Sequence, residues 1–132
     1  TRLVDVVKSA NAEPSGSMNN GKWVELSADA PDVTAITSSA LSKQLGEWKN
    51  SKGLNKLFLR AKNGTLVAGA KKPLVYNISK RPPFKNAIAG KVWHGGKAKP
   101  DPTTQIKSVQ IAVPVKDGSE IIGVLHSSVI VP

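Results

Sequence analysis

The sequence predicts an α+β domain in which a central antiparallel sheet carries helices mainly on one of its faces. Two turn signals, Asn63-Gly64 and Asp117-Gly118, separate runs of apolar residues, as the turns of β-hairpins do. A third segment, residues 33–48, instead repeats its apolar residues with the spacing of a helix. Helices packed against one face of an antiparallel sheet define the α+β class.

The main helix is expected over residues 33–48. Its apolar residues share one face, and they are Val33, Ile36, Ala40, Leu41, Leu45 and Trp48. Either Asp29 or Asp32 is expected to cap its start, because an aspartate side chain accepts from the first free backbone N–H groups. Pro31 suits an early helical position, and Gly53 suits a left-handed end.

The remaining segments outside the strands are shorter. Residues 1–12 fit a short amphipathic helix, although their β-branched content also fits a strand. Residues 13–22 have the composition of a loop. Residues 84–89 are expected to form one or two helical turns that end at Gly90.

Five strands are expected. The first hairpin joins residues 54–61 to residues 65–70, and the second joins residues 106–116 to residues 120–131. A short strand is expected at residues 92–94. The order along the chain is therefore helix, hairpin, short helix, short strand and long hairpin.

Size and composition favour one ordinary globular domain. The chain has 132 residues, 39% of them hydrophobic, which is enough to bury a core without cross-links. It has no cysteine, which excludes disulfides, thiol catalysis and cysteine-ligated metal sites. No apolar run approaches the length of a membrane span.

The net charge of +10 favours anionic partners, namely nucleic acid, anionic lipid or a small carboxylate or phosphate. The lysines are scattered along the whole chain, whereas a nucleic-acid motif usually concentrates them on one helix or loop. Aromatic residues make up only 5%, which argues against a stacking platform for bases. A basic nucleic-acid-binding module is therefore kept as the alternative function, and nucleic acid is not the favoured partner.

The sequence does not predict an enzyme. Only two histidines are present, His94 and His126, and neither has an acidic residue nearby in a recognisable motif. His126 is expected to be structural because it falls in the last strand. The nine carboxylates occur singly, and no glycine-rich phosphate loop is present. We therefore expect no catalytic residue, no metal and no cofactor.

Three segments together resemble one known family. Residues 108–118, Ser-Val-Gln-Ile-Ala-Val-Pro-Val-Lys-Asp-Gly, followed by Ile121-Ile122-Gly123-Val124-Leu125, are similar to the hairpin that ends a Cache domain. Residues 80–91, Lys-Arg-Pro-Pro-Phe-Lys-Asn-Ala-Ile-Ala-Gly-Lys, resemble the family's Asp-Arg-Pro-Tyr-Phe-Lys segment. Residues 57–59 with residues 64–68 resemble its strand, Asn-Gly, strand element. Cache domains are the PAS-like extracytoplasmic sensors of bacterial chemoreceptors and sensor kinases.

The resemblance implies a single-module Cache-like sensor domain over residues 1–132, with 1–30 as a lead-in and 31–131 as the core. It implies a periplasmic or extracytoplasmic location, a role in signal transduction and a small-molecule ligand such as a small organic acid or similar anion. A homodimer or a membrane-bound receptor is the context implied. Lys80 and Pro83 depart from the family pattern, where Asp and an aromatic residue are usual, and this leaves the ligand class open.

If the resemblance holds, a ligand pocket lies between the sheet and residues 81–91. Its expected lining is Tyr76, Arg81, Phe84, Trp93, His94, Ser108 and Gln110. The Arg81 guanidinium can take a carboxylate through two parallel hydrogen bonds, or it can instead donate to backbone carbonyls of its own loop. Trp93 and Tyr76 can form an aromatic wall, although Trp93 can equally be part of the core.

The polar candidates also have two interpretations each. His94 can donate to a ligand and respond to pH, or it can simply face water at a loop edge. Gln110 is expected to point to the side opposite Val109 and Ile111, where it either lines the pocket or meets solvent. A third hypothesis is an interaction scaffold, because PAS-like domains often pair through an N-terminal helix.

Overall fold

The computed structural model describes residues 2–13 and 17–131, so predictions that fall on residues 1, 14–16 and 132 lie outside its described part. The helices are α1 (Arg2–Ala12), α2 (Asn20–Glu25), α3 (Pro31–Thr37), α4 (Ala40–Ser51) and α5 (Pro82–Ile88). The strands are β1 (Leu54–Ala61), β2 (Leu66–Gly69), β3 (Trp93–His94), β4 (Lys99–Pro100), β5 (Lys107–Asp117) and β6 (Glu120–Ile130). Among the described helices, none is long and apolar enough to cross a bilayer.

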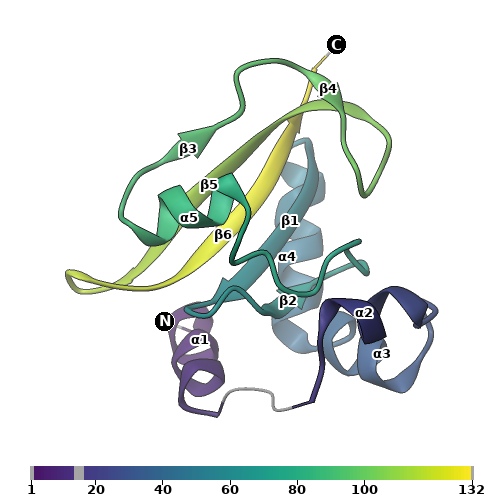
Figure 1. The fold of residues 1–132 in the computed structure, drawn as a ribbon, viewed down its shortest axis with the longest axis vertical. Coiled ribbons are helices and arrows are strands. Elements are labelled where there is room, and N and C mark those ends of the chain that lie inside the picture. Colours follow the sequence, from purple (N-terminus) through teal and green to yellow (C-terminus); the bar gives the residue numbers. More distant parts are fainter. Residues whose placement is uncertain (1, 14–16, 132) are drawn as a thin grey trace.

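One antiparallel sheet organises the molecule (Figure 1). Its strand order is β2-β1-β6-β5-β3, and β4 pairs with the other end of β5. The last strand in sequence, β6, therefore lies at the centre, between the first hairpin and β5. The predicted α+β class, with an antiparallel sheet and helices mainly on one face, is confirmed.

Both predicted hairpins form, and each depends on a glycine with positive φ. Gly118 has φ 63° in the turn between β5 and β6, where Asp117 pairs with Glu120. Gly64 has φ 91° between β1 and β2, and its N–H donates to the Ala61 carbonyl at 2.9 Å. Only glycine adopts this backbone conformation without steric cost, which is why the two turn signals located the hairpins well.

The single helix expected over residues 33–48 is wrong, because the chain forms two helices, α3 and α4, in its place. Ser39 caps α4 by accepting from the backbone N–H of Ser42 at 3.1 Å. Serine side chains compete with helical hydrogen bonds in this way, so the apolar periodicity continues across a break in the backbone. Gly53, with φ 65°, follows the end of α4 as expected.

The predicted caps at Asp29 and Asp32 are also wrong. Ala30 is the N-cap of α3 and makes no side-chain capping bond, while Asp29 accepts from the hydroxyl of Ser27. Pro31 does occupy the first helical turn. With Pro31 lacking an N–H, part of the need for a cap is already removed.

The N-terminal part is more helical than the sequence indicated. Of the two alternatives for residues 1–12, the helix is correct for the described residues, Arg2–Ala12. Helix α2 was not predicted, and it begins within the segment expected to be a loop. Asn19 caps it by accepting from the Lys22 N–H at 2.9 Å, and the side chain of Trp23 is fully buried.

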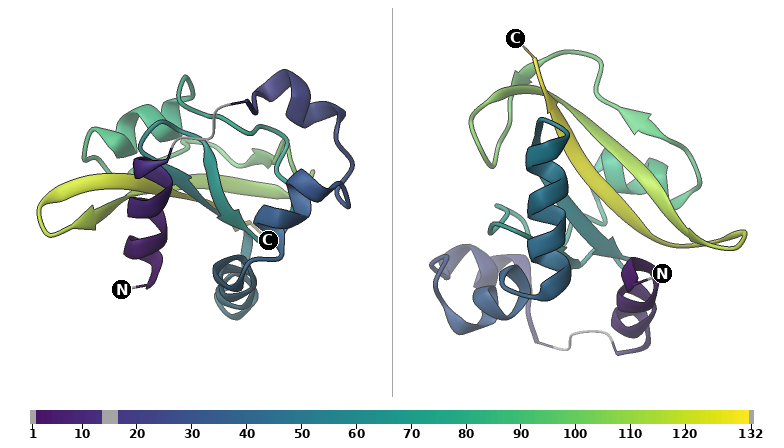
Figure 2. Two further views of the ribbon diagram at one scale, coloured as in Figure 1. Left: turned by 90° about the horizontal axis from the view of Figure 1, so that it is seen from below. Right: turned by 180° about the vertical axis from the view of Figure 1, so that it is seen from behind.

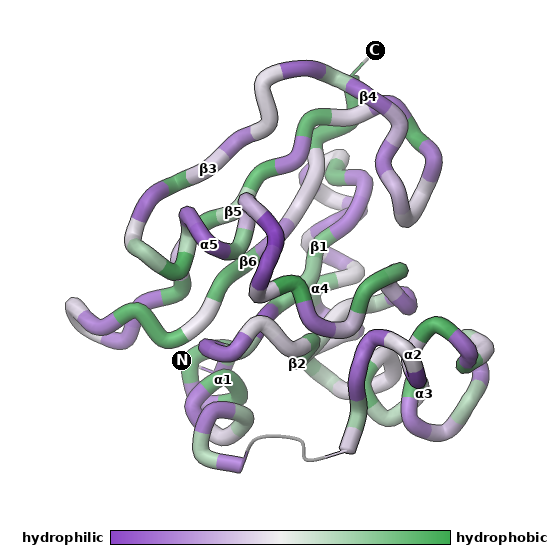
Figure 3. Tube along the Cα trace, viewed as in Figure 1, coloured by the Kyte–Doolittle hydropathy of each residue, from purple (hydrophilic) through white to green (hydrophobic). Residues whose placement is uncertain are grey.

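The two faces of the sheet are covered differently (Figure 2). Helices α1 and α4 lie on one face, where they form an apolar core with the sheet, and α5 lies on the other. The buried members of that core are Val7, Leu41, Leu45, Leu59, Ala68, Val115 and Ile122. Figure 3 shows hydrophobic residues along much of β5, between hydrophilic ends. The face that carries α5 holds the candidate site.

Candidate ligand-binding cavity

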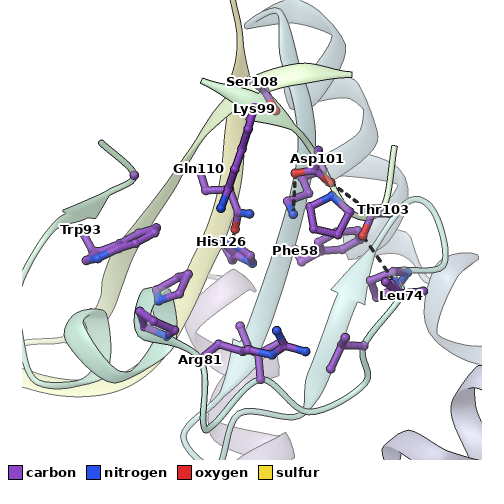
Figure 4. Close-up of a pocket in the computed structure, with 18 of the residues that line it drawn as sticks. Phe58, Leu74, Arg81, Trp93, Lys99, Asp101, Thr103, Ser108, Gln110 and His126 are labelled. Atoms are coloured by element: carbon purple, nitrogen blue, oxygen red, sulfur yellow. Dashed lines mark hydrogen bonds and ion pairs between the residues drawn. The ribbon is translucent and has the colours of Figure 1, made fainter. Parts of the chain in front are cut away.

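A cavity of about 550 Å³ lies on the α5 face of the sheet (Figure 4). The sheet forms its floor, and its walls come from the segment before α5 and from the loop that contains β4. Its lining residues are Lys56, Phe58, Arg60, Pro73, Leu74, Val75, Ile78, Arg81, Pro82, Pro83, Trp93, Gly95, Gly96, Lys97, Lys99, Pro100, Asp101, Pro102, Thr103, Ser108, Gln110 and His126. This volume falls within the range of small-molecule sites in proteins.

Strand register brings the floor residues together. Side chains alternate along a strand, so Lys56, Phe58 and Arg60 on β1 share one face. Phe58 lies opposite His126 of β6. On β5, Gln110 lies two residues before Ala112, the partner of His126, and therefore on the same face of the sheet. Residues from three strands thus converge on one polar surface beneath the cavity.

Arg60 ties the cavity wall to the sheet. Its side chain is buried, with only 2% of the residue exposed, and its Nη1 and Nη2 donate to the carbonyls of Tyr76 and Val75 at 2.6 and 3.1 Å. Burial lowers the pKa of Arg60 to about 9, so the guanidinium keeps its charge at neutral pH. Arg60 thus holds a neighbouring segment by donating to its backbone carbonyls. This is the structural role that the sequence left open for Arg81.

A buried ion pair holds the β4 loop. Lys56 Nζ lies 2.8 Å from Asp101 Oδ2, and both side chains are almost completely buried. Asp101 Oδ1 also accepts from the N–H groups of Thr103 and Thr104 at 2.8 and 3.3 Å. Burial acts to raise the pKa of Asp101, but the bonds from Lys56 and these amides lower it overall, whereas burial lowers the pKa of Lys56. The loop is therefore fastened to β1 by a charged contact.

The third buried polar contact joins the last two strands. The Nε2 atom of His126 lies 2.8 Å from Oε1 of Gln110. Burial, followed by the nearby charges of Lys56 and Arg60, lowers the pKa of His126 to about 3. His126 is therefore neutral at physiological pH. The sequence predicts a structural role for it, and in the structure it also lies in the cavity floor.

The charge of the lining is strongly one-sided. Five of its side chains are basic, and they are Lys56, Arg60, Arg81, Lys97 and Lys99. Among the lining residues the only acid is Asp101, which Lys56 already pairs. Within the part of the chain that the structure describes, no three His, Asp or Glu side chains are grouped to hold a metal ion. The side chains of this cavity are suited to an anion.

Four of the seven predicted site residues line the cavity together: Arg81, Trp93, Ser108 and Gln110. Trp93 and Arg81 lie on different walls of the same hollow (Figure 4). Trp93 also packs partly against the core beneath α5, so both of its interpretations apply. The Ser108 hydroxyl is already used, because it donates to Ile106 O at 3.1 Å and accepts from the Asn55 amide at 3.3 Å. Ligand binding by these residues stays a prediction.

The other three do not line the cavity. Tyr76 is buried against Trp23, with ring centroids 5.1 Å apart, because its segment turns the ring away from the hollow. Phe84 is buried in the core between α5 and the sheet. His94 is exposed, since it alternates with Trp93 on β3 and so faces the opposite way.

Sequence reasoning missed Lys56, Arg60, Asp101 and the two loop lysines. One signal was available, because Lys56, Phe58 and Arg60 alternate with Leu57 and Leu59 along the strand, which places the two cations on one face. Cations at alternate positions of a mostly apolar strand indicate either a solvated face or a paired, functional one. Only the structure decides between these, because Asp101 is distant in sequence.

Comparison with known proteins relates this fold to sensor domains. No protein-family model matches the chain, and no curated protein matches it. Among solved structures it is similar to the sensor domain of the histidine kinase DctB from V. cholerae, at 20% identity and a TM-score of 0.63. That match covers 98% of this chain and 43% of the DctB domain.

Two further structures are similar. The sensory domain of the chemoreceptor Tlp3 from Campylobacter jejuni, with isoleucine bound, has 12% identity and a TM-score of 0.56, and the match covers 98% of this chain and 58% of that one. The extracellular domain of rpHK1S-Z16, assigned as a histidine kinase, has 15% identity and a TM-score of 0.55, with 96% and 46% covered. This chain therefore spans about half the length of the structures it matches.

The fold is that of the Cache-type sensor domains, as the sequence motifs implied. These neighbours are sensor, sensory and extracellular domains of histidine kinases and of a chemoreceptor. The nucleic-acid alternative is not favoured by this comparison.

Proposed function

We propose that this domain is an extracytoplasmic sensor module that binds a small organic anion, such as a carboxylate, in the cavity on the α5 face. The observation that carries the proposal is the charge of the lining, where Lys56 pairs the one acid and four further basic side chains have no acid to pair with. In a partly enclosed site of this kind, the attraction between opposite charges is stronger than in bulk water.

Arg81 is the residue proposed to bind the anion directly. It lines the cavity from the start of α5, and the structure gives its guanidinium no hydrogen bond within the described residues. By contrast, Arg60 and Lys56 are engaged by carbonyls and by Asp101. A free guanidinium can present two parallel N–H donors to a carboxylate.

The β4 loop supplies the second part of the proposed mechanism. Lys97 and Lys99 lie on it, exposed and on the cavity wall, while Asp101 fastens it to β1. An anion bound between Arg81 and these lysines would join the α5 segment to the loop. A ligand that contacts two walls stabilises the arrangement in which they are closest, and this is how binding would be transmitted.

A thermal-shift screen of small organic acids tests the proposal. At a ligand concentration of 100 times Kd, binding stabilises the native state by about 2.7 kcal/mol, which is easily detected. We expect at least one acid to raise the Tm, and Arg81→Ala to abolish the shift. Lys85→Ala is the matched control, because Lys85 is an exposed cation of α5 outside the lining and should keep the shift.

An equal shift in Arg81→Ala and in the unaltered protein would remove the role of Arg81. A panel in which no acid raises the Tm would remove the function itself. Pairing with a second copy stays a prediction, and light scattering on the purified chain tests it.

A further inference from the structure

The hydrogen bond between His126 and Gln110 fixes how the cavity floor can interact with a ligand (Figure 4). His126 is nine-tenths buried, with 6% of the residue exposed, and Gln110 lies beside it on the lining. The carbonyl oxygen of an amide can only accept hydrogen bonds. With Oε1 of Gln110 at 2.8 Å, Nε2 of the imidazole is therefore the protonated nitrogen.

The surroundings of His126 favour the same tautomer. Its other nitrogen, Nδ1, is buried without a hydrogen-bond partner among the described residues. Two cations, Lys56 and Arg60, act on the ring, and Asp101 opposes them only partly. Close to positive charge a buried lone pair costs less than a buried N–H, so Nδ1 is the unprotonated atom.

The amide nitrogen of Gln110 is consequently left as a donor. Its Oε1 is occupied by His126, and the structure gives its Nε2 no partner within the described residues. Two N–H groups on the cavity floor can bind a carbonyl or carboxylate oxygen of a ligand. They repel an ammonium group, which has only donors.

The carboxylate of the lining and three carbonyls beside the cavity already have partners. Both oxygens of Asp101 are engaged, one by Lys56 and one by backbone N–H groups. Along the wall before α5, the carbonyl of Pro73 accepts from the indole of Trp23 at 2.9 Å, and the carbonyls of Val75 and Tyr76 accept from Arg60. A ligand ammonium would therefore enter a basic cavity with no free carboxylate to pair it.

We propose that the cavity selects organic acids that lack an amino group, with Gln110, held in one orientation by His126, donating to a second oxygen of the ligand. This inference rests on the proposed function and specifies its ligand class. The similar Tlp3 domain, in contrast, has an amino acid, isoleucine, bound in its structure.

Three matched pairs of probes test the selectivity by calorimetry: 3-methylbutanoate with valine, glutarate with glutamate, and 3-phenylpropanoate with phenylalanine. Within each pair the two molecules differ only by the amino group. We expect each acid to bind at least about tenfold more tightly than its amino acid, and glutarate to bind most tightly. Glutarate has one carboxylate for the basic wall and one for Gln110.

Two substitutions at one position test the role of Gln110. Gln110→Glu places an acceptor on the floor and should lower the preference for glutarate over glutamate by about tenfold or more. Gln110→Leu removes both donors at similar volume, so it should weaken glutarate without improving glutamate. An unchanged preference in Gln110→Glu would remove Gln110 from the selectivity.

The positioning role of His126 has its own spectroscopic readout. Nitrogen NMR of the imidazole should show the Nε2–H tautomer from pH 5 to 8, and the Nδ1–H tautomer would contradict the orientation of Gln110. An amino acid that binds as tightly as its acid would overturn this inference and leave the proposed function standing. Absence of binding by every acid would remove both.

Discussion

The two faces of the central sheet bury different kinds of side chain, although the same strands form both. On the face covered by α1 and α4, buried residues such as Leu45 and Leu59 are apolar and pack against one another. On the opposite face the buried residues include Lys56, Arg60 and His126. Leu59 and Arg60 are neighbours in sequence, yet they contribute to different environments because side chains alternate along β1.

This difference between the two faces separates the residues that stabilise the fold from those that can bind a ligand. Burying apolar surface stabilises the fold without requiring particular partners. Burying a cation is costly, and on the cavity face each buried cation has a specific partner, the carbonyls for Arg60 and Asp101 for Lys56. We call the face covered by α1 and α4 the helical face. Substitutions there should change stability and leave ligand selectivity intact. Substitutions on the cavity face should disrupt the buried polar pairs and change ligand binding.

The largest effect is expected for Leu45→Ala on the helical face. Leu45 is fully buried in the core cluster, and truncation of such a leucine destabilises a protein by about 4 kcal/mol because it leaves a cavity. Urea unfolding measures the change. Val24→Ala, at a position that is 53% exposed, is the control and should change stability by less than about 0.5 kcal/mol. Equal effects of the two substitutions would contradict the assignment of this core.

Asp101→Asn should have the next largest effect, although Asp101 lies in a loop. It leaves the buried ammonium of Lys56 without its counter-charge, which costs about 3 kcal/mol. The double variant Lys56→Met with Asp101→Asn should recover part of this loss, since no buried charge is then left over. Urea unfolding of the unaltered protein, Asp101→Asn, Lys56→Met and the double variant completes a double-mutant cycle. A coupling near zero would show that the pair does not fasten the loop.

Gly123→Ala tests how closely β1 and β6 approach. A Cβ atom at position 123 would lie 2.5 Å from the backbone oxygen of Arg60, which cannot move without displacing the strand. Overpacking of this kind costs about 2 kcal/mol. Gly96→Ala is the control, because a Cβ there meets nothing within 4 Å. A thermal unfolding curve unchanged by Gly123→Ala would mean that the strands can separate.

The local parts of this fold could be predicted from the sequence, and the distant contacts could not. The Gly64 and Gly118 turns specify both hairpins, because the required backbone angles are those of glycine. The break at Ser39 was hidden, since apolar periodicity reports which side is buried and not whether the helix is continuous.

The site residues, too, could be predicted where local sequence determines them and not where contacts between distant segments do. Arg81 and Gln110 could be placed on the cavity side from the resemblance and from strand alternation. The ion pair of Lys56 with Asp101 and the donation of Arg60 to wall carbonyls could not, because each joins segments far apart in the chain. The orientation of Tyr76 depends on its packing against Trp23, which is also a long-range contact.

The smallest expected effect is a pH dependence of stability that the cavity face alone should produce. His126 has a pKa of about 3 in the folded protein, because burial and the charges of Lys56 and Arg60 disfavour its protonated form. In the unfolded chain its pKa returns to about 6.5. Between these values the unfolded state binds one more proton, so stability falls as the pH falls below 6.5 and is unaffected by this group above it.

The expected slope below pH 6.5 is about 1.4 kcal/mol per pH unit from His126. Urea unfolding at pH 7.5, 6.5 and 5.5 measures it, and His126→Gln should remove that component while His94→Gln, at the exposed histidine, should keep it. A slope that survives His126→Gln would place its origin elsewhere. Because the helical face buries no charged or titratable side chain in its core cluster, loss of the slope in His126→Gln alone would assign the pH dependence to the cavity face.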